Sequence, residues 1–212
     1  ARITSQGKCN LCGETFNKAA MTRHLSKCTT EHSKRTADSK QLFQLQVEGR
    51  GAPEYWMHLA VPADASLLVL DKFLRNTWLE CCGHLSMFTI AGQVYDVNPE
   101  ADPWSGKKTK GMSAKMRDVL ESGVKFNHEY DFGTTTELVL KVVTEYPGNS
   151  KSIQILARNN PPDIPCAKCG KPASQVCSNC NYEGPAAWLC DEHAQDHTCG
   201  EDYFLPVVNS PR

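Results

Sequence analysis

The sequence QLFQLQVEGRGAPEYWMHLAVP, residues 41–62, alternates apolar and polar side chains on both sides of a Gly-Arg-Gly turn at residues 49–51. An alternation with a period of two is the pattern of a β-strand, and two such runs joined by a short glycine-containing turn predict a hairpin. We therefore expect residues 41–48 and 55–62 to pair as antiparallel strands, and the rest of a central domain to assemble around them.

A helix and further strands follow this hairpin. With Asp64 or Ser66 as the candidate cap, apolar residues recur at helical spacing, namely Leu67, Leu70, Phe73, Leu74 and Trp78. A second helix is expected over residues 114–121, ending before Gly123. Short strands are expected over residues 87–90, 93–95, 124–132, 135–144 and 152–157. Strands with segregated helices predict the α+β fold class, here a central mixed sheet with two helices.

Two motifs of this central domain resemble a known family. The sequences WLECCGHLSMFTI at residues 78–90 and YDFG at residues 130–133 are similar to the plasmid pRiA4b ORF-3-like family, whose members are sometimes labelled resolvase-like passengers of insertion elements. The resemblance covers residues 41–160, and it implies an α+β domain with a likeness to a β-grasp and no established activity. Residues 134–137 replace the acidic residue and the Trp that usually follow YDFG in the family, and no Ser nucleophile in an Arg-rich setting supports resolvase chemistry.

Candidate metal ligands lie near the N-terminus. Cys9 and Cys12 form a Cys-x2-Cys knuckle, and His24 and Cys28 are one helical turn apart, so the four side chains can converge on one zinc ion. The stretch resembles a two-Cys two-His finger with Cys as its last ligand, although its eleven-residue spacer is one residue shorter than usual.

This N-terminal region, residues 1–40, is basic, with eight Lys or Arg against three Asp or Glu. Phosphate contacts position a protein on nucleic acid without reading its sequence, and the side chains expected to make them are Lys18, Arg23 and Lys27. The resemblance to the finger family places Asn17, Ala20 and Arg23 at base-reading positions, which are too few to specify a genomic site. A solvated basic helix or a protein-binding finger is the alternative.

Residues 161–212 contain eight further candidate ligands, which fall into four pairs. The pairs are Cys166/Cys169, Cys177/Cys180, Cys190/His193 and His197/Cys199. We expect a cross-brace, in which pairs one and three hold one zinc ion and pairs two and four hold the other. Two sequential ribbons, the first formed by residues 166–180, are the alternative. The spacing is similar to that of B-box fingers and of the two-zinc fingers of stress-associated proteins, and the acidic surface of this module favours a protein partner over nucleic acid.

The twelve candidate ligands suffice for three four-coordinate zinc ions and include nine of the eleven cysteines. Disulfides are the competing interpretation, but nine thiols cannot all pair among themselves, and a disulfide framework does not need His at ligand spacing. Since four protein ligands leave no open position for a catalytic water, we expect these zinc ions to be structural and the chain not to be an enzyme.

The central domain offers few groups for catalysis. The candidates for acid–base chemistry are His84, His128, Glu129 and Asp131, and the candidates for a nucleophile are Cys81 and Cys82. The two cysteines are better explained as small buried groups, and His128 lies on the inward-facing side of its expected strand. A hydrolase or nuclease that uses these side chains is therefore the least favoured class.

The sequence also bears on location. No apolar run approaches the ~20 residues that cross a bilayer, and the first residues lack the hydrophobic stretch of a signal peptide. Free thiols suit a reducing compartment, so we expect a cytoplasmic protein without membrane contact. Together these features predict a zinc-dependent adaptor, which binds DNA or structured RNA, including ribosomal RNA, through the finger and a protein partner through the C-terminal module. A purely protein-binding scaffold is the alternative.

Overall fold

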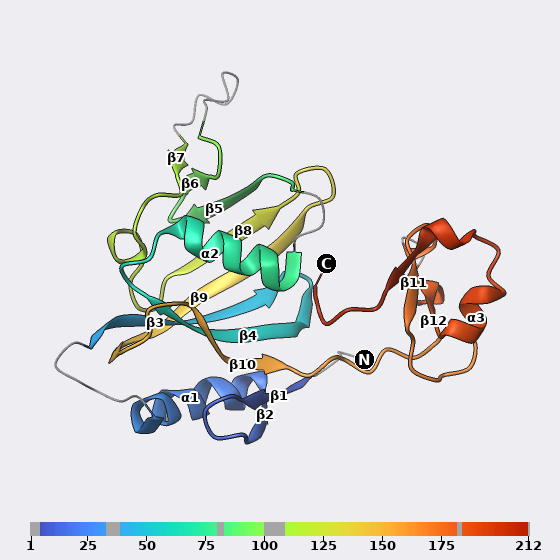
Figure 1. The fold of residues 1–212 in the computed structure, drawn as a ribbon, viewed down its shortest axis with the longest axis horizontal. Coiled ribbons are helices and arrows are strands. Elements are labelled where there is room, and N and C mark those ends of the chain that lie inside the picture. The colour runs from blue at the N-terminus through green and yellow to red at the C-terminus, as the bar shows by residue number, and fades with distance from the viewer. Residues whose placement is uncertain (1–4, 33–38, 80–82, 100–108, 182–183, 212) are drawn as a thin grey trace. The chain divides into compact units, whose positions relative to one another are not determined.

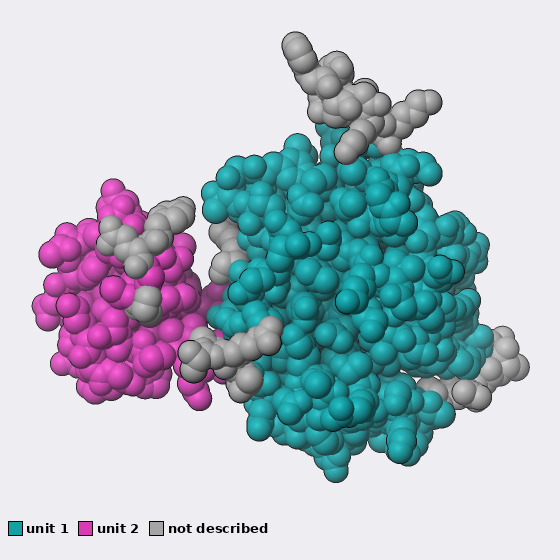
Figure 2. Space-filling view, turned by 180° about the vertical axis from the view of Figure 1, so that it is seen from behind, with its two compact units in different colours: residues 1–160, 210–212 teal, residues 161–209 magenta. Residues whose placement is uncertain are grey.

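The structure is a computed structural model, and it describes residues 5–32, 39–79, 83–99, 109–181 and 184–211. The chain divides into two compact units, which Figure 2 colours separately. Unit 1 comprises residues 1–160 and 210–212, and unit 2 comprises residues 161–209. The N-terminal finger therefore belongs to the same unit as the central sheet.

Unit 1 is built on one sheet whose described strands follow the order β2-β1-β10-β4-β3-β9-β8-β5-β6-β7 (Figure 1). The strands are β1 (Gln6–Cys9), β2 (Thr15–Asn17), β3 (Lys40–Gly49), β4 (Ala52–Pro62), β5 (Ser86–Ile90), β6 (Gln93–Asp96), β7 (Lys110–Gly111), β8 (Lys125–Tyr130), β9 (Thr136–Gly148) and β10 (Gln154–Asn159). Among the described pairs, β6 and β7 run parallel and the others run antiparallel. The α+β class is confirmed, and the β-grasp likeness stays a prediction.

The expected hairpin forms the middle of this sheet. Strands β3 and β4 pair in a register that runs from Leu42 opposite Pro62 to Glu48 opposite Trp56, and the chain turns at Gly51 with a positive φ of 78°. Both faces of the hairpin are buried, because apolar residues of one parity contact one core and those of the other parity contact a second core. The period-two pattern located the strands, but it did not reveal that both faces are covered.

Helices cover the two faces. On one face lies α2 (Leu67–Leu74), which continues as the π-helix η1 (Arg75–Leu79) and buries the expected side chains Leu67, Leu70, Leu74 and Trp78. On the other face lies α1 (Lys18–His32) of the finger, whose Met21 and Leu25 are fully buried against Trp56 and its neighbours. The sheet is therefore the middle layer of three, with one helix on each side.

The second predicted helix, over residues 114–121, is wrong. That segment forms only the 3-10 turn η2 (Met116–Asp118). Its backbone is bonded to the loop before α2 instead, with Met116 N donating to Ala65 O at 2.9 Å and Leu67 N donating to Ala114 O at 2.9 Å. Tertiary hydrogen bonds thus replace the bonds that a helix would need.

Unit 2 is a small module with its own three-stranded sheet. Its elements are β11 (Gln175–Cys177), η4 (Pro185–Ala187), β12 (Trp188–Leu189), α3 (Asp191–Gln195), η5 (Glu201–Tyr203) and β13 (Phe204–Pro206), in the sheet order β12-β11-β13. Its buried core consists of Leu189 and two cysteines, with Ala194 and Phe204 packed against them. A core this small cannot hold a fold by burial alone. Among the described residues, no helix is long and apolar enough to span a bilayer.

Candidate metal centres

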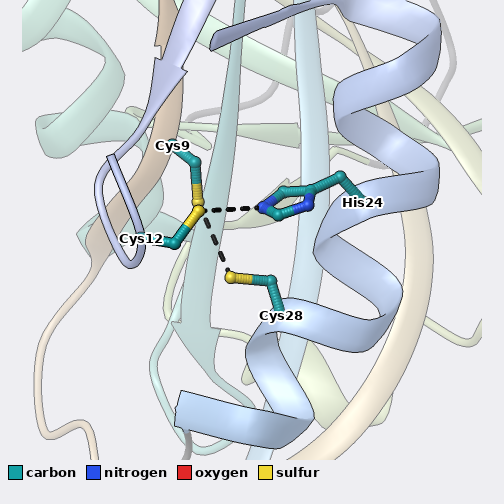
Figure 3. A group of neighbouring side chains, drawn as sticks. All are labelled: Cys9, Cys12, His24 and Cys28. Atoms are coloured by element: carbon teal, nitrogen blue, oxygen red, sulfur yellow. Dashed lines mark hydrogen bonds between the residues drawn. The ribbon is translucent and has the colours of Figure 1, made fainter. Parts of the chain in front are cut away.

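The first candidate centre joins the finger hairpin to its helix (Figure 3). Cys9 ends β1, Cys12 follows in the turn before β2, and α1 places His24 and Cys28 one turn apart on the face that looks back at the knuckle. The ligand atoms of all four side chains lie within 4.8 Å of one another. The sulfurs of Cys9 and Cys28 are 3.9 Å apart, and Cys12 Sγ lies 3.3 Å from His24 Nε2.

The remaining eight ligands form two further centres in unit 2. One joins Cys166 and Cys169 to Cys190 and His193, and the other joins Cys177 and Cys180 to His197 and Cys199. Pair one therefore combines with pair three and pair two with pair four, in the arrangement of a cross-brace. The alternative of two sequential ribbons, in which residues 166–180 would share one ion, is wrong.

Distances within these two centres repeat those of the first. The sulfurs of Cys169 and Cys190 are 3.8 Å apart, and those of Cys180 and Cys199 are 3.7 Å apart. His193 Nδ1 lies 3.3 Å from Cys190 Sγ, and His197 Nε2 lies 3.4 Å from Cys180 Sγ.

These separations fit a tetrahedral ion. With metal–sulfur distances of about 2.3 Å and metal–nitrogen distances of about 2.0 Å, two sulfurs lie about 3.8 Å apart and a sulfur lies about 3.5 Å from a nitrogen. A disulfide would instead require sulfurs about 2.05 Å apart. The nine cysteines that the structure describes are all free, so each group could hold a metal ion.

The thiols of the three groups differ in pKa. Burial, followed by the neighbouring Cys9 thiol, raises the pKa of Cys28 to about 12, and contact with the Cys199 thiol raises the pKa of Cys180 to about 12. Although burial opposes it, hydrogen bonds from backbone groups lower the pKa of Cys166 to about 6. A metal ion therefore has to displace the protons of those thiols whose pKa is raised. A divalent ion would bind as those protons leave.

Two side chains outside the predicted ligand set contact ligand residues. His32 lies one turn after Cys28, with its Nδ1 2.9 Å from the Cys28 carbonyl oxygen and 3.5 Å from the Cys28 sulfur, and Asn179 Nδ2 donates to Cys199 Sγ at 3.4 Å. Such outer contacts fix the direction of a metal ligand. The i, i+4 spacing of His32 from Cys28 was the available signal for the first of them, whereas only the folded module reveals the second.

The three side chains predicted to contact phosphates differ in the structure. Lys18 is occupied, since its Nζ lies 2.5 Å from Glu48 Oε2 and donates to the Pro53 carbonyl at 3.3 Å. Arg23 and Lys27 are exposed on α1. Of the base-reading positions, Asn17 accepts a hydrogen bond from Ala20 N at 2.9 Å, so its side chain caps the helix.

The candidate catalytic groups form two pairs, which Arg75 and Tyr130 connect. Arg75 lies 3.8 Å from Asp71 Oδ2 and over the Tyr130 ring, whose hydroxyl accepts from His84 N at 3.3 Å. His128 is fully buried, with its Nε2 2.7 Å from Asp71 Oδ1, whereas the half-buried His84 has its Nε2 3.6 Å from Asp131 Oδ2. Asp131 also accepts from Gly133 N at 3.0 Å, as expected of a turn residue. The candidate nucleophiles Cys81 and Cys82 lie outside the described residues.

Comparison with known proteins identifies the central domain. No curated protein matches the chain. A crystal structure of a protein of unknown function, MM3350 from Methanosarcina mazei Go1, is similar at a TM-score of 0.46 and 18% identity, covering 56% of this chain and 68% of that one. Residues 41–173 match the family described as plasmid pRiA4b ORF-3-like protein, so the match continues beyond residue 160 into the first knuckle of unit 2. The chain belongs to the plasmid pRiA4b ORF-3-like protein family.

Proposed function

We propose that this chain is a zinc-dependent binding protein without catalytic activity. The observation that carries the proposal is the closure of each centre by four protein side chains, three Cys and one His. A catalytic zinc ion keeps a position for water or substrate, whereas a four-ligand site is structural. Thiolate and imidazole donors at tetrahedral separations are a set that zinc prefers. We therefore assign one zinc ion to each centre, in a compartment reducing enough to keep the thiols free, such as the cytoplasm.

Unit 2 is the module to which we assign protein binding. Residues 161–209 contain two Lys and no Arg against seven Asp or Glu, and metal binding to six thiolates adds further negative charge. This charge repels the phosphates of nucleic acid and suits a protein surface. The cross-brace ligand sets support the likeness to B-box fingers.

Nucleic-acid binding by the finger is a second candidate, supported by the exposure of Arg23 and Lys27 on α1. Replacing both by Ala should weaken binding to every sequence alike and flatten its salt dependence by about two contacts' worth of slope. Replacing Lys18 by Ala should leave that slope unchanged, because its charge is already paired with Glu48. Equal nucleic-acid affinity of the parent protein and the double variant would contradict nucleic-acid binding by the finger. Absence of binding by the parent protein at low salt would contradict it too.

Zinc content and partner capture test the main proposal. Native mass spectrometry of the purified chain should show three zinc ions. Cross-linking in the protein's own cells should capture a partner with the parent chain and lose it with Cys190→Ser, which breaks one unit 2 centre. Fewer than three ions at full occupancy, or equal capture by Cys190→Ser, would contradict it.

A further inference from the structure

One edge of the unit 2 sheet combines a strand that is paired on one side only with exposed apolar side chains. Among the described strands, β13 lies at the end of its sheet and pairs only with β11. Tyr203 and Leu205, two residues apart at this edge, are 49% and 51% exposed.

The register of β13 shows which backbone groups face outward. Ser178 N donates to Tyr203 O at 2.8 Å and Val207 N donates to Ser174 O at 2.9 Å, so every second residue of this segment is bonded to β11. The residues between them, Phe204 and Pro206, direct their backbone groups away from β11. Proline has no N–H, so the outer edge carries one N–H and two carbonyls. An added strand could bond to these groups.

The two faces of β13 differ in chemistry. Leu205 and Phe204 lie on opposite faces, because side chains alternate along a strand, and Tyr203, the last residue of η5, directly precedes them. Beside Phe204 is a cavity of about 340 Å³, which is also lined by Asp191, Glu201 and the uncharged side chains of Gln175, Ala194 and Gln195. One face is therefore apolar and open, and the other has an aromatic wall and two carboxylates.

We propose that β13 receives an extended segment of a protein partner in which basic and apolar residues alternate. The segment adds to the outer edge of β13, with its Lys or Arg side chains in the Asp191–Glu201 cavity and its apolar side chains on Tyr203 and Leu205. Charge complementarity selects a basic segment, since unit 2 is acidic and the cavity places two carboxylates beside an aromatic ring. Backbone pairing of this kind supplies affinity, and the alternate side chains supply specificity. This inference rests on the proposed role of unit 2 in protein binding.

A synthetic peptide provides the test. The probe is a fluorescent seven-residue peptide that alternates Lys and Val, and its control is an isomer of the same composition with all Lys before all Val. Anisotropy with the zinc-loaded full chain should show the alternating peptide binding at least tenfold more tightly than the isomer. Equal binding of the two peptides, or no binding of the alternating one at millimolar concentration, would overturn the proposal.

Matched variants locate the site. Asp191→Asn with Glu201→Gln removes two charges from the cavity, and Asp163→Asn with Asp196→Asn removes two exposed charges elsewhere in unit 2. The first pair should weaken the alternating peptide about tenfold, and the second pair much less. Equal losses of peptide affinity in the two double variants would show that only the net charge of unit 2 matters, and this would contradict the proposed site. Zinc content, measured for each variant, reports whether unit 2 is still folded.

The inference and the proposed function fail in different ways. If the parent chain captures a partner that Cys190→Ser loses, while the peptide does not bind, then unit 2 binds protein through another surface. If neither capture nor peptide binding depends on Cys190, then the protein-binding role of unit 2 is wrong.

Discussion

Lys18 Nζ of the finger helix lies 2.5 Å from Glu48 Oε2 of strand β3, and each side chain is 28% exposed. Lys18, which was predicted to contact phosphate, therefore pairs with a residue of the central sheet. Around it, β1 pairs with β10 from Gly7 opposite Asn159, and the finger helix shares a buried core with β3, β4 and β10. The finger is thus a layer of unit 1.

The ion pair can be measured directly. In a double-mutant cycle of Lys18→Ala and Glu48→Ala, we expect a coupling of about 1 kcal/mol in the free energy of unfolding, because the pair is only partly shielded from water. Urea unfolding of the four proteins gives this value. A coupling of zero would mean that the two side chains act independently.

Metal loss should affect the two units differently. Cys28→Ser is expected to lower the unfolding temperature of unit 1, since Cys28 is part of the core between the finger and the sheet. Cys190→Ser is expected to unfold unit 2 and to leave the unit 1 transition in place. Calorimetry of both variants tests this, and amide exchange should quicken in β10 only with Cys28→Ser. An unchanged unfolding temperature of unit 1 in Cys28→Ser would show that the metal centre of the finger does not stabilise the sheet.

Gly7 is expected to be essential for docking the finger. A Cβ on Gly7 would clash with the Arg158 carbonyl oxygen and approach the Trp56 ring to 2.6 Å. Gly7→Ala should therefore destabilise unit 1 by a few kcal/mol, in the range of about 1–3 that overpacking costs. Gly111→Ala is the control, because its nearest neighbour would be Pro99 at 3.5 Å. Similar unfolding temperatures for the two variants would contradict the close approach.

The buried His58 predicts loss of stability in acid. Burial, with the Lys18 charge as a second cause, lowers the pKa of His58 to about 4, compared with about 6.5 in an unfolded chain. The unfolded chain binds the proton more readily, so stability is complete above pH 6.5 and falls between pH 6.5 and about 4.

Replacing His58 removes this proton linkage. In His58→Gln, the stability lost between pH 7 and pH 5 should shrink by about 2 kcal/mol, at about 1.4 kcal/mol per pH unit below 6.5. Urea unfolding at both pH values, with zinc content measured in parallel, provides the comparison. If the parent and His58→Gln lose the same free energy of unfolding between pH 7 and pH 5, then His58 does not take up a proton on unfolding.

The buried pair of His128 and Asp71 is expected to stabilise the fold. Burial lowers the pKa of His128 even though the hydrogen bond to Asp71 opposes this shift, which favours a neutral imidazole that donates to the carboxylate. Asp71→Ala should cost about 1–3 kcal/mol, because it leaves the buried N–H of His128 without an acceptor. The exposed Asp64, which pairs with Arg117, is the control, and Asp64→Ala should cost less than about 1 kcal/mol. Equal effects on the urea midpoint would argue against this difference.

Much of the structure was present in local sequence patterns. Period-two alternation gave the β3–β4 hairpin, helical spacing gave α2, and the Cys and His spacings selected the twelve side chains of three clusters. These features depend on residues close together in the chain, where strand geometry, helical periodicity and the reach of a knuckle decide the outcome. A local pattern failed at residues 114–121, because the donors and acceptors there bond to residues 63–67.

Only the tertiary structure decided which segments meet. The grouping of four ligand pairs into a cross-brace and the docking of the finger against β10 both depend on contacts between residues far apart in sequence. The sequence shows a lysine at position 18 on an expected helix, but it does not show that the lysine pairs with Glu48. The sequence therefore determined which side chains can bind metal. The packed sheet determined which surfaces remain free, because burial and pairing depend on the partners that folding brings together.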